Sequence, residues 1–152
     1  MSRYDLVSHW HVEAPIDRVF QVVHDVEGWP RWWPQVREVV RVERGDADGV
    51  GDVHRVIWGT TVPYQLTLTL KRMVVQRPWR LDLLLEGDLH GNGRWLLREQ
   101  GGATVIQHDW HVATTRTWMN VMSPVLGPMF RWNHGILMAD GARGLARLLA
   151  QD

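Results

Sequence analysis

The chain has 152 residues, 17 basic and 17 acidic side chains, and no formal net charge at neutral pH. This length is most simply one domain, 1–152, and the lack of a basic stripe argues against nucleic acid or anionic membrane as a partner. No cysteine is present, which excludes disulfides and thiol chemistry. The polar start, residues 1–5, predicts neither a signal peptide nor a stable membrane anchor, so we expect a cytoplasmic protein.

The first strand is predicted over residues 4–13, where side chains alternate as in a half-buried strand. Two short helices follow, the first beginning at Pro15 and the second at Pro30. The second helix carries three tryptophans, which we expect to form a lid beside the mouth of a pocket: Trp29, Trp32 and Trp33. The alternative is that Trp32 or Trp33 only anchors that lid.

Six further strands are predicted over residues 36–115. Alternation is clearest over residues 64–70, and the pair Gly101-Gly102 is a hairpin signal. Short hairpin connections make the predicted sheet antiparallel. One face of these strands carries large or titratable side chains, which we expect to point inward: His54, Trp58, Trp95, His108 and Trp110.

The last element is a predicted helix over residues 117–151. Pro124 and Pro128 should kink it or split off an opening turn. Its apolar stripe, expected to face the sheet, follows steps of three and four: Trp118, Met122, Val125, Met129, Trp132, Ile136 and Ala139. The order is one strand, two short helices, six strands and one long helix, which places the chain in the α+β class.

Three stretches resemble a known superfamily: "VEAPIDRVFQVVHDVEGWPRWWPQV", "GDLHGNGRW" and "TTRTWMNVMSPVLGPMFRWNHGILMADGARGLARLL". They are similar to the START-like, or SRPBCC, superfamily, and the last resembles its polyketide cyclase/dehydrase or lipid-transport branch. The resemblance covers essentially the whole chain and implies a helix-grip fold, in which a curved seven-stranded antiparallel sheet surrounds a long C-terminal helix and a deep cavity. It implies a hydrophobic ligand and supplies no catalytic motif.

Three inward-facing polar residues are the candidates for chemistry: His54, Tyr64 and His108. A histidine in an apolar pocket can move protons in a cyclisation or dehydration, and a tyrosine can donate to a ligand carbonyl or enolate oxygen. The alternative is that each is a core residue satisfied by a backbone group or a buried water.

Ten tryptophans are present, against two tyrosines and two phenylalanines. We predict a roomy cavity between the sheet and the last helix, lined by Trp10, Trp33, Trp58, Trp95, Trp110, Met129, Trp132 and Asn133. The alternative is that the rings fill this space themselves. The expected partner is a small hydrophobic molecule such as a lipid, a quinone or a polyketide-like chain, and no cofactor is expected.

Histidine clustering raises the question of a metal. His9 and His11 share the outward face of the first strand, and Asp109 and His111 share that of the last. Zinc accepts such ligands if these strands pair and the four side chains meet. A solvated sheet face far from the cavity explains the same pattern, and we predict no metal site.

Three classes of function remain open. The first is a cyclase, aromatase or dehydrase that uses the inward-facing histidines and tyrosine. The second is a carrier or chaperone that tethers a lipid or quinone without changing it. The third is a protein-interaction module, which an exposed apolar patch on the strands or the lid would favour. The sequence leaves the oligomeric state open.

Overall fold

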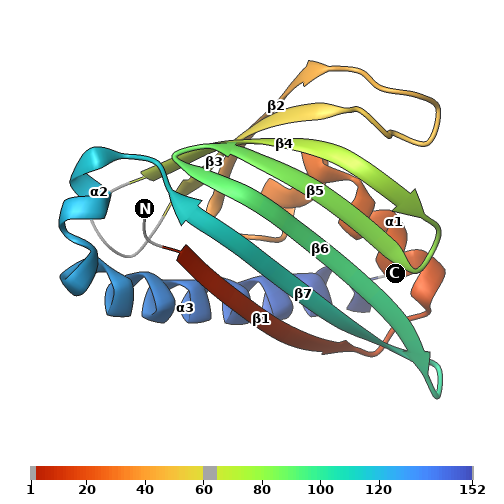
Figure 1. Cartoon of the computed structure of the whole chain (residues 1–152). Helices are drawn as coiled ribbons and strands as arrows, with labels where there is room; N and C mark the ends of the chain where they lie inside the picture. Colours follow the sequence, from red (N-terminus) through yellow and green to blue (C-terminus); the bar gives the residue numbers. More distant parts are fainter. Residues whose placement is uncertain (1–2, 60–64, 152) are drawn as a thin grey trace.

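The structure is a computed structural model that describes residues 3–59 and 65–151. Its elements follow the predicted order of one strand, two short helices, six strands and a long helix (Figure 1). In chain order they are β1 (Arg3–Val12), α1 (Ile16–His24), η1 (Val26–Arg31), β2 (Val36–Glu43), β3 (Val53–Gly59), β4 (Gln65–Gln76), β5 (Arg80–Gly87), β6 (Leu89–Gln100), β7 (Ala103–Thr114), α2 (Thr117–Val121) and α3 (Ser123–Ala150).

The seven strands form one antiparallel sheet in the order β1-β7-β6-β5-β4-β3-β2. Neighbours in sequence pair with one another, except that β1 closes the far edge beside β7. The sheet curves over α3, which runs along its inner side (Figure 1). This is the α+β helix-grip arrangement, and the predicted fold class is confirmed.

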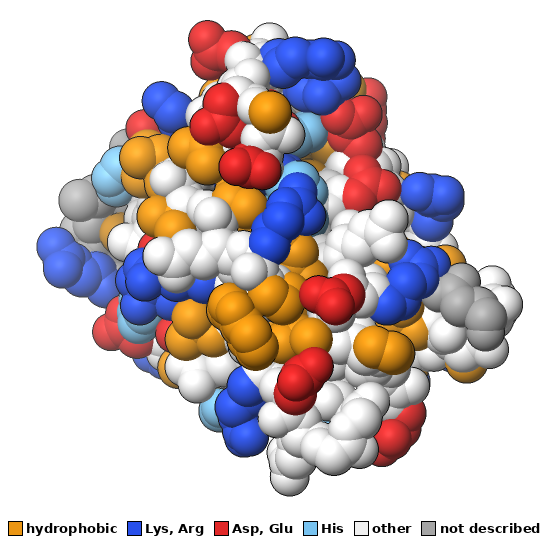
Figure 2. Space-filling view, turned by 90° about the vertical axis from the view of Figure 1, so that its right-hand side faces the viewer, with side chains coloured by type: hydrophobic (Ala, Val, Ile, Leu, Met, Phe, Trp, Pro, Cys, Tyr) orange, Lys and Arg blue, Asp and Glu red, His pale blue; other side chains and the backbone are white. Residues whose placement is uncertain are grey.

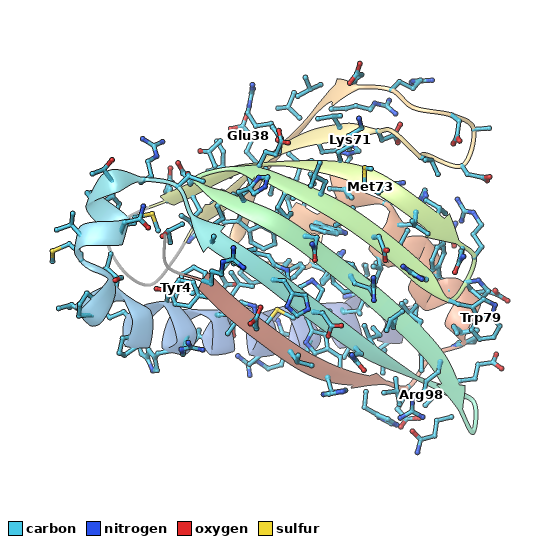
Figure 3. All side chains as sticks on the ribbon, viewed as in Figure 1. Tyr4, Glu38, Lys71, Met73, Trp79 and Arg98 are labelled. Atoms are coloured by element: carbon cyan, nitrogen blue, oxygen red, sulfur yellow. The ribbon has the colours of Figure 1, made fainter. Side chains whose placement is uncertain are left out.

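Alternating burial along the strands confirms the inward positions that the sequence predicts. On β3, His54, Val56 and Trp58 are buried, and on β5 Leu81 and Leu83 are buried. Residues between them are more exposed because successive strand side chains point to opposite faces. On the outer face, Met73 of β4 and Trp79 of the β4–β5 turn reach solvent (Figure 3).

The C-terminal helical segment is divided at Met122, between α2 and α3. Pro124 occupies the first turn of α3, where a missing backbone N–H costs no hydrogen bond. The predicted splitting of an opening turn is therefore confirmed. Pro128 lies within α3, which continues past it to Ala150.

The face of α3 that meets the sheet is not the predicted one. Trp118, Val125 and Trp132 are exposed, with 60% of the Trp132 surface open to solvent. The buried residues of α3 are instead Phe130, Asn133, His134, Leu137, Met138, Gly141, Gly144, Leu145 and Leu149.

Two glycines explain why the helix turns this face inward. A Cβ on Gly141 would lie 2.7 Å from the Trp33 ring, and one on Gly144 would overlap the backbone of Trp32. Only the glycine face lets α3 approach the bulky 32–33 segment, since any larger side chain would hold the two backbones apart. Large apolar residues occur on both faces, so their periodicity alone selected the wrong one.

Candidate functional site

The space between the sheet and α3 is occupied by tryptophan rings. Trp33 lies at its centre, with ring centroids 5.5 Å from Trp10, 5.0 Å from Trp58 and 6.0 Å from Trp95. These pairs meet edge to face, the arrangement that aromatic quadrupoles favour. The Trp33 N–H donates to the carbonyl of Leu137 at 2.9 Å, which ties this cluster to α3.

Trp29 is a part of this cluster rather than a lid over it. Its ring centroid lies 5.5 Å from Trp33 and 5.8 Å from Trp95, and its N–H donates to the Val23 carbonyl at 2.9 Å. The short helix η1 therefore holds Trp29 in the core, which differs from the lid role expected for this residue.

Within the described residues, the interior contains two small cavities of about 10 Å³ each. The first is lined by Trp29, Trp33, Trp58, Leu70, Leu83, Leu85, Gly93, Trp95, His108 and Trp110. The second is lined by Trp58, Leu66, Trp110, Phe130, Asn133, His134 and Leu137. A space of about 10–15 Å³ is what one water molecule needs. The expected roomy cavity is therefore wrong for this structure, because the rings fill the space.

His108 of β7 is enclosed by this aromatic cluster. Its Nε2 accepts a hydrogen bond of 2.9 Å from the Trp110 N–H, so the proton of the neutral ring lies on Nδ1. Burial holds the pKa of His108 well below its usual range, and the nearby His134 lowers it further. At neutral pH His108 is therefore an uncharged donor and has no free basic nitrogen.

His134 of α3 is the second histidine at these cavities, and it lies outside the apolar stripe that the sequence predicts. Its ring centroid lies 5.4 Å from Trp110, and burial lowers its pKa to about 4. Asn133 beside it is also buried and lines the second cavity, as predicted. The glycines at positions 141 and 144, seven and ten residues further along the same helix, were the sequence signal for this face.

Several buried polar atoms at these cavities have no hydrogen-bond partner within the described residues: Trp58 Nε1, Trp95 Nε1, His108 Nδ1 and His134 Nε2. Their residues line one cavity or both. Unsatisfied buried polar groups are few in folded proteins, and each costs about 1–3 kcal/mol. The walls of the interior are therefore mostly apolar, but they carry several polar atoms that lack a hydrogen-bond partner.

His54 belongs to a different set of contacts. Its Nε2 lies 3.3 Å from Oε1 of Glu27, and the same oxygen lies 3.3 Å from Nε of Arg41. Burial lowers the pKa of His54, and the hydrogen bond with Glu27 partly opposes this effect. His54 therefore links β3 to η1, and the structure does not join it to His108. Tyr64 lies outside the described residues.

The remaining predicted ligand-binding residues differ in position. Trp10, Trp58, Trp95 and Trp110 are buried, as predicted. Met129 is half-buried. Trp132 faces solvent, and its predicted inward position is wrong for the reason given for α3. At the other end of the sheet, Tyr4 packs on Phe130 of α3 with centroids 4.5 Å apart (Figure 3).

The possible zinc ligands do not gather. Strand register pairs His111 with Asp5 and Asp109 with Val7, while His9 and His11 lie further along β1 opposite Gln107 and Val105. His111 Nδ1 lies 2.8 Å from Asp5, and Asp109 accepts from Gln107. Among residues 3–59 and 65–151, no group of three or more histidine, cysteine or acidic side chains is placed to hold a metal.

Solved structures of low sequence identity share this fold. A START superfamily protein from Mycobacterium smegmatis superposes with a TM-score of 0.78 at 20% identity, over 97% of each chain. The Zhui aromatase/cyclase from Streptomyces sp. R1128 has a TM-score of 0.70 at 18% identity, over 96% of this chain and 94% of that one. The di-domain aromatase/cyclase BexL, from the BE-7585A biosynthetic pathway, has a TM-score of 0.73 at 19% identity, and this chain spans half of its length.

A comparison of the sequence with curated proteins gave no match. No helix in the described part of the chain is long and apolar enough to cross a bilayer. The family model described as polyketide cyclase / dehydrase and lipid transport matches residues 5–150, nearly the whole sequence. The chain therefore belongs to the polyketide cyclase/dehydrase and lipid transport family.

Proposed function

We propose that the protein binds a small hydrophobic molecule with at least one oxygen acceptor between the sheet and α3, and that it holds this molecule without acid–base chemistry. The observation that carries the proposal is the set of unpartnered donors around the two cavities, above all Trp58 Nε1, Trp95 Nε1 and His108 Nδ1. A carbonyl or phenolic oxygen of a ligand would accept from them, while its body would contact the rings.

The protonation of the histidines supports binding over catalysis. His108 already accepts from Trp110 at Nε2, and its lowered pKa keeps it neutral at physiological pH. His134, with a pKa of about 4, is too weak a base to remove a proton efficiently near neutrality. Both groups are suited to orienting an oxygen. The carrier hypothesis therefore has better support than a cyclase, aromatase or dehydrase.

Binding requires the interior to open. Ligand pockets start at about 300 Å³, and at about 24 cal/mol per Å³ such a space costs about 7 kcal/mol when empty. Ligand surface removed from water must offset this cost. The segment best placed to yield is α2 with the first turns of α3, because Met119 and Phe130 are its only buried residues between positions 117 and 132. We therefore expect slow, modest-affinity binding with movement of this segment.

Paired ligands and paired variants test the proposal. Menadione carries two carbonyls, whereas 2-methylnaphthalene has a similar body and none. Replacing both Trp58 and Trp95 by phenylalanine removes two N–H donors and retains aromatic rings. We expect this variant to lose about tenfold or more in affinity for menadione, at about 1 kcal/mol for each hydrogen bond, and little for 2-methylnaphthalene.

Trp79→Phe, at the exposed β4–β5 turn, is the matched control and should bind as the wild type does. Calorimetry or ligand-observed NMR gives the affinities, and urea unfolding checks that each variant is folded. Equal losses for both ligands would contradict the donor role. Failure of the wild type to bind either ligand would reject the interior as a binding site. Native mass spectrometry of material released on denaturation identifies any bound molecule, and a chemically altered product would favour the enzyme.

The exposed part of the C-terminal helices favours a second candidate, a protein-interaction module. Several large apolar residues there are open to solvent: Trp118, Val121, Met122, Val125 and Trp132. Large exposed apolar patches commonly mark interaction sites. If the wild type binds no ligand, and Trp132→Ala abolishes self-association or partner binding while Trp79→Ala does not, this candidate replaces the first.

A further inference from the structure

Another hollow lies outside the tryptophan core. It is a groove of about 530 Å³ bordered by α1, η1, the β4–β5 turn and the end of α3. The residues that matter below are His24, Arg31, Arg77, Val22, Trp32 and Leu148. Figure 2 views this end of the molecule and shows basic and histidine side chains beside hydrophobic ones. The groove is within the size range of small-molecule sites.

Two guanidinium groups converge on His24 at this groove. Arg72 is buried, and its Nη1 lies 2.6 Å from His24 Nε2 while its Nη2 donates to the His24 carbonyl at 2.8 Å. Nη2 of Arg77 lies 3.3 Å from the same imidazole nitrogen. Burial lowers the pKa of His24, and the charges of both arginines lower it further. The Asp48 carbonyl, 2.9 Å from His24 Nε2, and the charge of Asp52 oppose these effects, but the pKa of His24 remains lowered. The imidazole therefore adds no positive charge beside the two guanidinium groups.

The nearby carboxylates do not neutralise these charges directly. Arg72 forms no ion pair with a carboxylate among the described residues, although Asp52, Asp25 and Glu27 act on it electrostatically. Asp52 accepts from the Gly45 N–H at 2.6 Å. Asp25 lines the groove and pairs with Arg31 at 3.5 Å, so a bound anion must compete with this carboxylate for Arg31. Arg72 does not line the groove, so an anion bound there would meet Arg77 directly and would act on the buried Arg72 only through its charge.

Arg18, Gln21 and Asp25 also line the groove, and the remaining part of its wall is apolar. Val22 and Leu148 line it, and so does Trp32, whose N–H is buried and has no partner within the described residues. The ring of Trp32 stacks on Trp33 at 5.3 Å, which fixes its orientation. The groove thus combines arginine forks, suited to oxyanions, with an aromatic wall.

We propose that this groove binds a phosphate ester carried on a small apolar or aromatic body. Arg77 and Arg31 contact the phosphate, and Trp32 and Leu148 contact the body. Several arginines favour a dianion over a monocarboxylate, because each additional positive charge interacts with both negative charges of the phosphate. The site is separate from the interior site proposed above, and it neither requires nor excludes a ligand there.

Four probe molecules separate the contribution of the phosphate from that of the apolar body: phenyl phosphate, inorganic phosphate, benzoate and phenol. We expect phenyl phosphate to bind most tightly, inorganic phosphate and benzoate more weakly, and phenol not measurably. Resonances of the His24 ring in two-dimensional NMR report local binding. The phosphate should raise the pKa of His24, because a nearby anion favours the imidazolium against Arg72 and Arg77, and Asp52 already acts in that direction.

Arg77→Gln should weaken phenyl phosphate about tenfold or more, as expected for a lost charged hydrogen bond. If Arg77→Gln is unstable, Arg31→Gln removes the other proposed phosphate contact, which comes from η1, and should weaken binding in the same way. Arg98→Gln removes an exposed arginine on β6 away from the groove and should bind as the wild type does (Figure 3). Higher salt should weaken binding.

Phenol binding as tightly as phenyl phosphate would overturn the proposal, as would an equal effect of Arg98→Gln and Arg77→Gln. Absence of saturable shifts at millimolar phenyl phosphate and low salt would also overturn it. None of these results bears on the interior site, whose probes are uncharged, so the two proposals fail separately.

Discussion

Replacing Gly144 of α3 by alanine should destabilise the protein, although alanine is normally the better helix former by about 1 kcal/mol. A Cβ at this position would lie 2.8 Å from the carbonyl carbon of Trp32 and closer still to its oxygen. The position of this Cβ is fixed by the helix backbone, and the atoms that it meets are backbone atoms, so no side-chain rotation relieves the contact. The helix or the 32–33 segment must move.

The cost follows from what that movement disturbs. Overpacking a well-packed core costs up to about 3 kcal/mol. Separation of α3 from Trp33 also weakens the hydrogen bond from the Trp33 N–H to the Leu137 carbonyl, worth about 1 kcal/mol. After the gain of about 1 kcal/mol in helix propensity is subtracted, we expect Gly144→Ala to lower the free energy of unfolding by about 3 kcal/mol and the Tm by about 9 °C.

Gly135 of the same helix supplies a control of opposite sign. A Cβ there meets no atom within 4 Å, so Gly135→Ala should gain about 1 kcal/mol and about 3 °C. Urea and thermal unfolding, followed by circular dichroism, measure both variants. If Gly144→Ala is as stable as the wild type, or Gly135→Ala is the less stable of the two, the proposed docking of α3 is refuted.

Three further predictions concern buried polar groups. The folded-state pKa of His134, about 4, lies below the unfolded value of 6.5, so the unfolded chain binds the proton first. The contribution of His134 to the free energy of unfolding should be fully present above pH 6.5. It should fall by about 3 kcal/mol as the pH is lowered towards 4. His134→Gln should flatten that pH dependence in urea unfolding, with His9→Gln as the matched surface control, and an unchanged slope would contradict it. Glu27→Gln should lower the pKa of His54 further in an NMR titration, because Glu27 now raises it against burial; a rise would show that the two side chains do not interact. Thr104→Val should cost about 1 kcal/mol, since its hydroxyl donates to the Ala14 carbonyl at 2.8 Å in the core, and a neutral substitution would mean that this bond contributes nothing.

The sheet was predictable from sequence because alternation is a local property. The inward positions of His54, Trp58 and Trp95 follow from a period of two along each strand, whatever the neighbouring strands do. The pairing of Trp110 with His108 also had a local signal, because residues two apart on a strand share a face. The tautomer of His108 follows from that pair.

The rotation of α3 and the filling of the cavity were not local properties. Apolar residues on both faces of α3 satisfied the helical period equally, and the inward face was decided by Gly141 and Gly144 against the 32–33 segment more than a hundred residues earlier. Likewise, inward tryptophans line a cavity or close it depending on distances across the sheet, such as the 5.0 Å between Trp33 and Trp58. No pattern along one element contains that distance.

The tryptophan cluster has an optical consequence. Indoles whose centroids lie 5–6 Å apart, as Trp33 does from Trp10, Trp58 and Trp95, share their electronic excitations. Their coupled transitions add bands to the far-ultraviolet dichroism that do not arise from the backbone, so a secondary-structure content read from that spectrum would be in error. The same coupling depends steeply on the spacing and angle of the rings. Any opening of the interior should therefore change these bands before it changes the helices or strands.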